Sequence, residues 1–185
     1  MSQSCLDCGQ RSDRVFCDLA PEALQEFDGI KSLQNHPRGA VLFREDQPAR
    51  EVFLLCEGRV RLWVCSESGR RMTLRVATGG EVLGLSAVLA GGRYEITAET
   101  MDAAQVAQVR RKDLLQFLRL HREVCMHVVN QLSEDLHVAY DRVRTATRPS
   151  LHSSHSLRTM ESSIEERTAG PPSALGCHAY RKSGA

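Results

Sequence analysis

The feature that most constrains the fold is an alternation of apolar and polar side chains in the middle of the chain. In RVRLWVC, residues 59–65, the apolar Val60, Leu62 and Val64 fall on one face of an extended strand. The same period of two runs through RMTLRVA, residues 71–77. Its apolar positions are Met72, Leu74 and Val76. A period of two with one apolar face is typical of a half-buried antiparallel strand.

Other short runs of the same kind surround these two, and each is bounded by Gly, Pro, Asp or Ser. They read GAVLFRED, EVFLLCEG, RYEITAET and AQVAQVRR. The segment Glu67-Ser68-Gly69-Arg70 joins the two central strands, where Gly69 can take the positive φ of a tight turn. Many short strands at a spacing of about 8–12 residues indicate a sandwich, barrel or jelly roll. We therefore expect a mainly β jelly roll over residues 19–110.

A helical pattern follows from about Lys112 to Ala146, a stretch without glycine or proline. A short amphipathic helix is expected first, and then a helix of at least about 20 residues ending near Thr145. Apolar residues of the long helix recur at alternating intervals of four and three: Cys125, Val129, Leu132, Leu136, Ala139, Val143 and Ala146. This heptad pattern predicts a homodimer through Val129, Leu132, Leu136, Ala139 and Val143. The alternative is a helix packed on its own roll, which also places apolar residues three and four apart.

Composition narrows the partners and the compartment. With 24 Lys+Arg against 23 Asp+Glu, the formal net charge is +1, which favours neither the presence nor the absence of nucleic acid binding. No apolar run reaches membrane-spanning length, and the N-terminus lacks the apolar core of a signal peptide, so we expect a cytoplasmic protein. Residues 147–185 are rich in Ser and poor in large apolar residues, which predicts disorder.

Three segments in combination resemble the Crp/Fnr superfamily of bacterial transcription regulators. They are PRGAVLFREDQPAREVFLLCEGRVRLW, GGEVLGLSAV and RRKDLLQFL, the last leading into the long helix, and the resemblance covers roughly residues 5–146. It implies a cyclic-nucleotide-binding-like sensor over residues 19–110 and a dimerisation helix within 111–146, after a cysteine-containing lead over residues 1–18. It also implies that an effector or redox signal regulates DNA binding by a C-terminal helix-turn-helix.

The chain departs from this family after Ala146, because residues 147–185 show no helix-turn-helix pattern. One interpretation is a truncated or frame-shifted product whose tail is translated out of frame. Another is a stand-alone sensor and dimerisation protein that does not bind DNA. The abrupt change in composition favours the first interpretation.

The resemblance also places an effector pocket around GGEVLGLSAV and the segment that follows it. Its candidate residues are Gly84, Leu85, Ser86, Ala87, Arg93, Glu95 and Thr97. In relatives that bind cyclic nucleotides, a Glu contacts the ribose and an Arg neutralises the phosphate. Here Leu85 takes the position of that Glu and Glu95 falls near that of the Arg, which disfavours cyclic nucleotide binding, although Arg93 lies close by. The alternative is that LGLSAVLA is a buried turn and short helix that packs the roll.

The cysteine-containing lead carries Cys5, Cys8 and Cys17, which resemble the N-terminal ligands of Fnr-type iron–sulfur sensors. The position expected for the fourth ligand holds Ala107, so Cys56 or Cys65 would have to replace it. Zinc, a redox-active dithiol and thiols without a metal remain open alternatives. The cofactor is thus an iron–sulfur cluster, another metal or none.

Enzymatic function is not expected, because the sequence contains no P-loop, GxGxxG motif or Ser/His/Asp set. A cupin-like metal protein is the alternative that shares the jelly roll. Cupins need several histidines facing inward, whereas only His36 falls in the expected roll. His121, His127 and His137 fall on the expected helices, where we expect them to face solvent.

Overall fold

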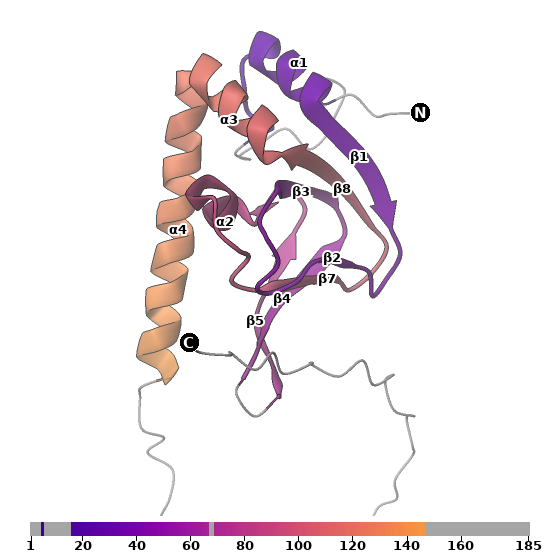
Figure 1. The fold of residues 1–185 in the computed structure, drawn as a ribbon, viewed down its shortest axis with the longest axis vertical. Helices are drawn as coiled ribbons and strands as arrows, with labels where there is room; N and C mark the ends of the chain where they lie inside the picture. Colours follow the sequence, from indigo (N-terminus) through magenta and orange to yellow (C-terminus); the bar gives the residue numbers. More distant parts are fainter. Residues whose placement is uncertain (1–4, 6–15, 67–68, 147–185) are drawn as a thin grey trace, which may run out of the picture.

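The computed structural model describes residue 5, residues 16–66 and residues 69–146. Within these ranges, eight strands form two four-stranded antiparallel sheets, which enclose the core of a jelly roll (Figure 1). The first sheet has the order β1 (Lys31–His36), β8 (Ala104–Arg110), β3 (Glu51–Glu57) and β6 (Val82–Leu83). The second has the order β2 (Val41–Phe43), β7 (Thr97–Thr100), β4 (Arg59–Cys65) and β5 (Arg71–Thr78). The predicted jelly roll is confirmed.

In the described part of the chain, the sheets are accompanied by helices α1 (Pro21–Ile30), α2 (Leu85–Ala90), α3 (Arg111–Leu120) and α4 (Arg122–Ala146). Helix α4 has 25 residues and runs along one side of the roll, which confirms the predicted long helix (Figure 1). None of the helices within the described ranges combines the length and apolar character needed to span a membrane. The expectations for residues 147–185, including disorder, lie outside the described residues.

The two central strands form the expected hairpin, and Gly69 has a φ of +74° in the turn. The expected apolar face of β5 is wrong in detail, because Met72 is 55% exposed and Val76 is 40% exposed. A register shift opposite Leu62 and Trp63 breaks the alternation. As a result, Leu74 and Arg75 both reach the inner side of the sheet. A bulge of this kind cannot be read from a period of two.

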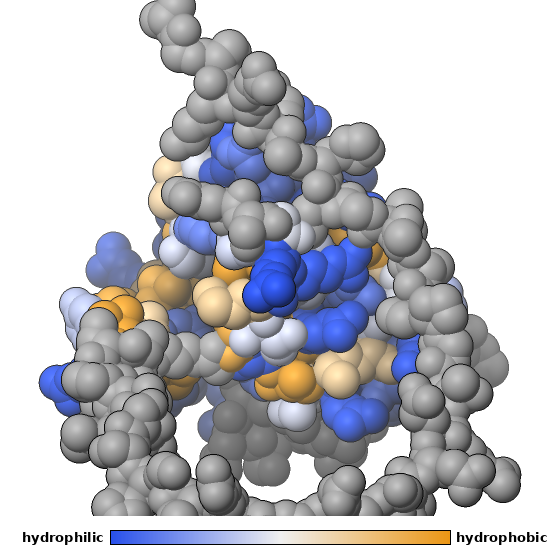
Figure 2. Space-filling view, turned by 90° about the horizontal axis from the view of Figure 1, so that it is seen from below, coloured by the Kyte–Doolittle hydropathy of each residue, from blue (hydrophilic) through white to orange (hydrophobic). Residues whose placement is uncertain are grey.

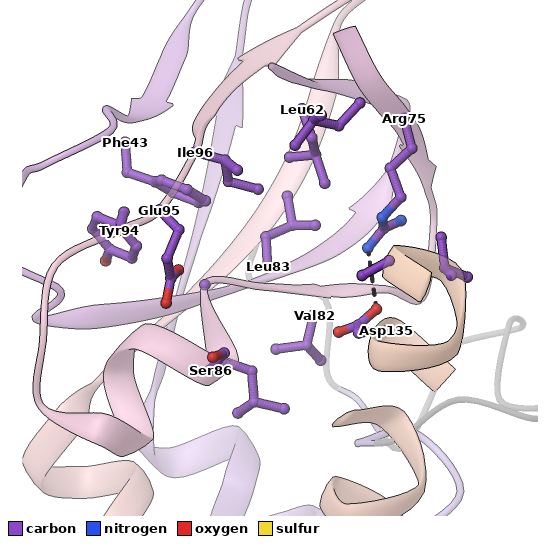
Figure 3. Close-up of a pocket in the computed structure, with 15 residues that line it drawn as sticks. Phe43, Leu62, Arg75, Val82, Leu83, Ser86, Tyr94, Glu95, Ile96 and Asp135 are labelled. Carbon is purple, nitrogen blue, oxygen red and sulfur yellow. Dashed lines mark ion pairs between the residues drawn. The ribbon is translucent and has the colours of Figure 1, made fainter. Parts of the chain in front are cut away.

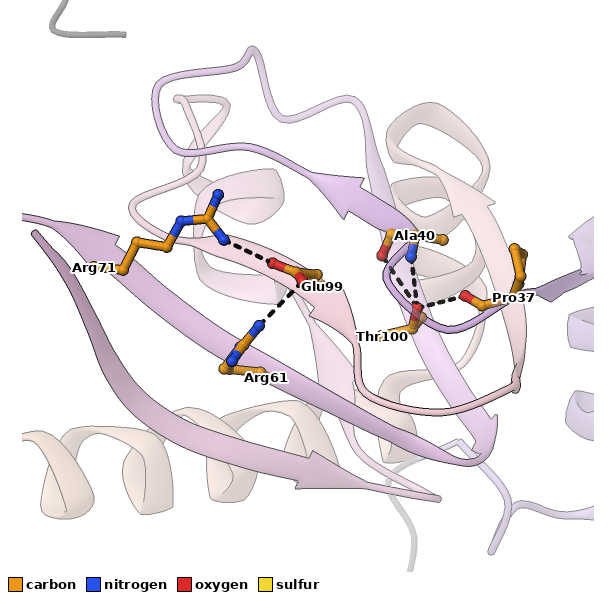
Figure 4. Close-up of polar contacts among 6 residues, drawn as sticks. All are labelled: Pro37, Ala40, Arg61, Arg71, Glu99 and Thr100. Atoms are coloured by element: carbon orange, nitrogen blue, oxygen red, sulfur yellow. Dashed lines mark hydrogen bonds and ion pairs between the residues drawn. The ribbon is translucent and has the colours of Figure 1, made fainter. Parts of the chain in front are cut away.

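Polar contacts centred on β7 stabilise the second sheet and the loop before β2 (Figure 4). Glu99 pairs with Arg61 of β4 at 3.0 Å and with Arg71 of β5 at 3.5 Å. The next residue, Thr100, donates a hydrogen bond to the carbonyl of Pro37 at 2.7 Å and so holds the loop before β2. Because the ion pairs of Glu99 occupy the outer face of the second sheet, its inner face is the one that packs the core.

Aromatic packing joins the helices at one end of the roll. Phe27 of α1 stacks on Phe16 at 5.0 Å between ring centroids and lies 5.5 Å from Phe117 of α3. His121, at the end of α3, was expected to face solvent, and this is wrong: its side chain is 14% exposed and its Nε2 lies 2.9 Å from Glu26 Oε2 of α1. These contacts pack α1 and α3 together at the end of the domain where α4 begins.

Candidate effector pocket

A cavity of about 320 Å³ lies between the second sheet, α2 and α4 (Figure 3). Its apolar lining includes Leu62, Leu83 and Ile96 from the roll and Val138 and Ala139 from α4. Its polar and charged lining consists of Arg75, Ser86, Tyr94, Glu95 and Asp135. The size lies at the lower end of the range for small-molecule sites, and the pattern of apolar walls with few polar groups is typical of them.

Gly84 shapes the wall of this cavity at the start of α2. Its φ is +76°, and a Cβ built on it would lie 2.7 Å from Cε1 of Tyr94. Both conditions require glycine, one for the backbone conformation and one for the close approach of the ring. The alternative interpretation of LGLSAVLA as a short packing helix is also correct, since Leu85, Ala87 and Val88 of α2 are buried.

Tyr94 links the cavity wall to the first sheet. Its hydroxyl donates a hydrogen bond to the Glu51 carbonyl at 2.6 Å, and its ring stacks on Phe43 at 4.1 Å between centroids. Burial raises the pKa of the Tyr94 hydroxyl, so the group stays protonated and keeps its donor role at neutral pH. Tyr94 therefore fixes the position of the next residue, Glu95, at the edge of the cavity.

An ion-pair network closes the other side of the cavity (Figure 3). Arg75 of β5 pairs with Glu81 and, at 3.6 Å between Nη2 and Oδ1, with Asp135 of α4. Burial raises the pKa of Asp135, while the Arg75 guanidinium opposes this shift. The guanidinium is thus shared between two carboxylates, and it links the roll directly to α4.

The structure separates the residues expected in the pocket. Those that line the cavity are Gly84, Leu85, Ser86 and Glu95. Those that do not are Ala87, Arg93 and Thr97. Ala87 is buried in the core, and the Thr97 hydroxyl accepts a hydrogen bond from the backbone NH of Glu45 at 3.0 Å. Arg93 is 60% exposed, and its guanidinium contacts both the backbone carbonyl and the side-chain carboxylate of Asp46.

Sequence reasoning missed Arg75, Asp135 and Tyr94. Arg75 occupies a position that the strand pattern assigns to solvent, because the bulge at the adjacent Leu74 leaves no mark in that pattern. Asp135 fits the pattern of a polar flank of the helix. Its spacing of seven residues from buried Val128, which places both on one helical face, was a usable signal.

The cysteine lead can be compared with the metal prediction only in part, because Cys8 lies outside the described residues. Lys31 Nζ donates to the Cys5 thiol at 2.9 Å, and Lys31 also pairs with Asp28 at 2.6 Å. Burial raises the pKa of Cys5, and Cys17 is buried in the apolar core. Within the described ranges, no group of three or more His, Cys, Asp and Glu side chains is placed to hold a metal. These surroundings do not fit a cluster at Cys5 and Cys17 in this arrangement, and metal binding stays a prediction.

Comparison with known proteins agrees with this fold. Residues 33–121 match the cyclic nucleotide-binding domain. The chain is 26% identical over 136 residues to the transcriptional activatory protein AadR of Rhodopseudomonas palustris, covering 74% of this chain and 56% of the relative. It is 26% identical over 129 residues to the nitrogen fixation regulation protein FixK of Bradyrhizobium diazoefficiens, covering 70% and 53%. The chain therefore spans about half the length of these curated relatives.

Solved structures share the fold. The catabolite activator protein of Thermus thermophilus superposes with a TM-score of 0.65 at 22% identity, covering 72% of this chain and 62% of the other. The sensor domain of the transcriptional regulator DNR of Pseudomonas aeruginosa gives 0.60 at 24% identity, covering 77% and 93%.

The fold is that of a cyclic nucleotide-binding domain. The similarity to AadR and FixK supports a relationship to the Crp/Fnr superfamily. Both AadR and FixK are named as regulators and not as enzymes, in agreement with the expectation of a non-enzymatic protein.

Proposed function

We propose that residues 19–146 form the sensor and dimerisation part of a Crp/Fnr-type transcription regulator. In this proposal residues 19–110 bind a small effector, and residues 111–146 connect the effector pocket to a second copy of the chain. Regulation of DNA binding is part of the proposal because relatives such as AadR and FixK are named as regulators. A stand-alone sensor with the same pocket and helix is the alternative.

The observation that carries the proposal is that α4 has two apolar faces. One face packs on the roll through buried Val124 and Val128 and continues to the cavity at Val138. The other face leaves large apolar side chains exposed: Met126 by 61%, Val129 by 51%, Leu136 by 50%, Tyr140 by 57% and Val143 by 61%. A single continuous helix that lines a pocket and presents a second apolar face is suited to relay pocket occupancy to a partner.

The exposed face follows a heptad pattern shifted slightly from the expected one. Met126 and Tyr140 join Val129, Leu136 and Val143 at intervals of three, four and seven residues. Leu132 packs partly against the core and Ala139 lines the cavity, so these two belong to the side of α4 that faces the roll. We propose that the dimer forms through the exposed set, with Leu132 and Ala139 at its margin. Seen from the end at which α4 finishes, hydrophobic side chains lie on the side occupied by this helix (Figure 2).

The pocket supports an effector other than a cyclic nucleotide. An exposed carboxylate, Glu95, lies at the edge of the cavity, and Arg93 is directed to Asp46 instead of the cavity. A phosphate placed there would face a negative charge and no arginine fork. Leu85 supplies no side-chain group that could hydrogen-bond a ribose hydroxyl.

Sedimentation equilibrium of the chain and of Leu136→Ala tests the dimer. Full burial of a Leu is worth about 1.5–3 kcal/mol, so burying the exposed half of Leu136 is worth about 1 kcal/mol in each subunit. Loss from both subunits should raise the dimer Kd by roughly 30-fold. Leu136→Lys should raise it further, because it places two ammonium groups at the seam.

Asn130→Lys is the matched control, since Asn130 is exposed and lies outside the apolar set on the same helix. It adds the same charge and should leave the dimer Kd nearly unchanged. A chain that stays monomeric at tens of micromolar, or equal effects of the two lysines, would contradict the proposed dimer.

A further inference from the structure

The centre of the cavity is built from aliphatic side chains. Val82, Leu83 and Ile96 lie between the two polar ends of the cavity (Figure 3). Val82 and Leu83 are 3% and 2% exposed, so this wall is a fixed part of the packed core. A ligand that fills this space must present an apolar body to it, since polar groups buried there would lose their hydrogen bonds to water.

The charges around this apolar centre are unbalanced. Arg75 is the one cationic side chain among the described residues that line the cavity, and it is held between Glu81 and Asp135. Glu95, at the other end, makes no ion pair within the part of the chain that the structure describes. Its carboxylate lies on the side of the cavity where α2 places the Ser86 hydroxyl (Figure 3).

Nearby arginines are directed elsewhere. Arg93 contacts Asp46, and Arg111 donates through Nε to the carbonyl of Val88 at 2.8 Å, at the far end of α2. Neither guanidinium lines the cavity. The end of the cavity at Glu95 therefore favours positive charge and disfavours negative charge.

We propose that this pocket binds a small ligand with an apolar body and a protonated amine. The amine lies at the end formed by Glu95 and Ser86, where it donates to the carboxylate and to the hydroxyl. The apolar body lies over Val82, Leu83 and Ile96 and reaches the inner face of α4. This assignment rests on the proposed effector-binding function and names the chemical class of the effector.

Three probes of matched shape test the assignment by calorimetric titration: 4-phenylbutylamine, 4-phenylbutan-1-ol and 4-phenylbutanoate. We expect the amine to bind most tightly, and at least tenfold more tightly than the carboxylate. Glu95→Gln should remove the preference for the amine over the alcohol. Arg93→Gln, a nearby exposed change outside the cavity, should preserve the preference.

A second variant tests the location of the apolar body. Ala139 lines the cavity from α4 and is exposed, so Ala139→Trp should fill the cavity without disturbing the core of the roll. It should abolish binding of the three probes together.

Equal binding of the three probes, preference for the carboxylate, or no binding of any probe would each overturn the assignment. Binding that persists in Ala139→Trp would overturn it too. Sedimentation of the same samples reports separately on the proposed function. A dimer that forms while the amine preference fails leaves the sensor and dimerisation proposal standing and removes only the ligand class.

Discussion

Replacement of Gly84 by alanine should destabilise the domain through two separable effects. The left-handed backbone at φ +76° costs about 1–2 kcal/mol for a residue with a Cβ. The added methyl would also lie 2.7 Å from Cε1 of Tyr94, a ring held by stacking and by its hydrogen bond to Glu51. Overpacking of this kind costs about 1–3 kcal/mol. The total expected loss in the free energy of unfolding is about 2–5 kcal/mol.

The chain supplies a control for the backbone effect alone. Gly39 has a φ of +82°, and nothing lies within 4 Å of a Cβ built there. Gly39→Ala should therefore cost only about 1–2 kcal/mol. The difference between the two substitutions measures the collision with the ring.

A double-mutant cycle isolates the same collision. Tyr94→Leu removes the ring atom that the methyl would meet, so in that background Gly84→Ala should cost about 1–2 kcal/mol. The coupling energy between the two sites is then about −1 to −3 kcal/mol. Urea unfolding at a fixed protein concentration, followed by the fluorescence of the single tryptophan, gives all the required values. Additive effects, or a cost at Gly84 no greater than at Gly39, would refute the close approach of ring and glycine.

The remaining predictions concern charge, ligand and metal. The hydrogen bond to Glu26 raises the pKa of His121 above 6.5, so its contribution to stability should be full below that pH and be lost as pH rises through the raised pKa; His121→Asn should be most destabilising at acidic pH in unfolding curves. Cyclic AMP and cyclic GMP should bind weakly or not at all because Glu95 opposes a phosphate, and micromolar affinity by calorimetry would contradict this. If the lead holds a cluster, anaerobically purified protein should show visible absorbance that is lost in Cys5→Ala or Cys8→Ala, whereas colourless, metal-free protein would exclude the cluster.

Local patterns predicted the architecture well. The alternation in RVRLWVC and the turn at Gly69 predicted the β4–β5 hairpin, and the heptad spacing predicted the length of α4. These features depend on short-range periodicity, which a single sequence displays directly. The residues that form the pocket wall cannot be predicted from this periodicity. Arg75 enters the cavity only through a shifted register, and Asp135 only through the packing of α4 on the roll.

The sequence placed the charged residues Glu95 and Arg93 near the expected pocket, but it could not identify the groups that each would contact. Glu95 lines the cavity as expected, whereas Arg93, two residues before it in the chain, turns to Asp46. The direction taken by a long exposed side chain depends on where other loops bring their carboxylates. That is tertiary information, and no spacing in the sequence encodes it.

Amide hydrogen exchange should differ along α4, because its first turns are packed against the core and its last turns are not. The first turns are anchored by buried Val124 and Val128, whereas beyond Asp135 the side chains of Leu136, Tyr140 and Val143 are half exposed or more. Local opening should therefore require least free energy in the last turns, where fewest apolar groups hold the helix. Protection of those amides would rise when the cavity fills or when a second copy covers the outer face, so the slowly exchanging portion of one helix would lengthen with either event.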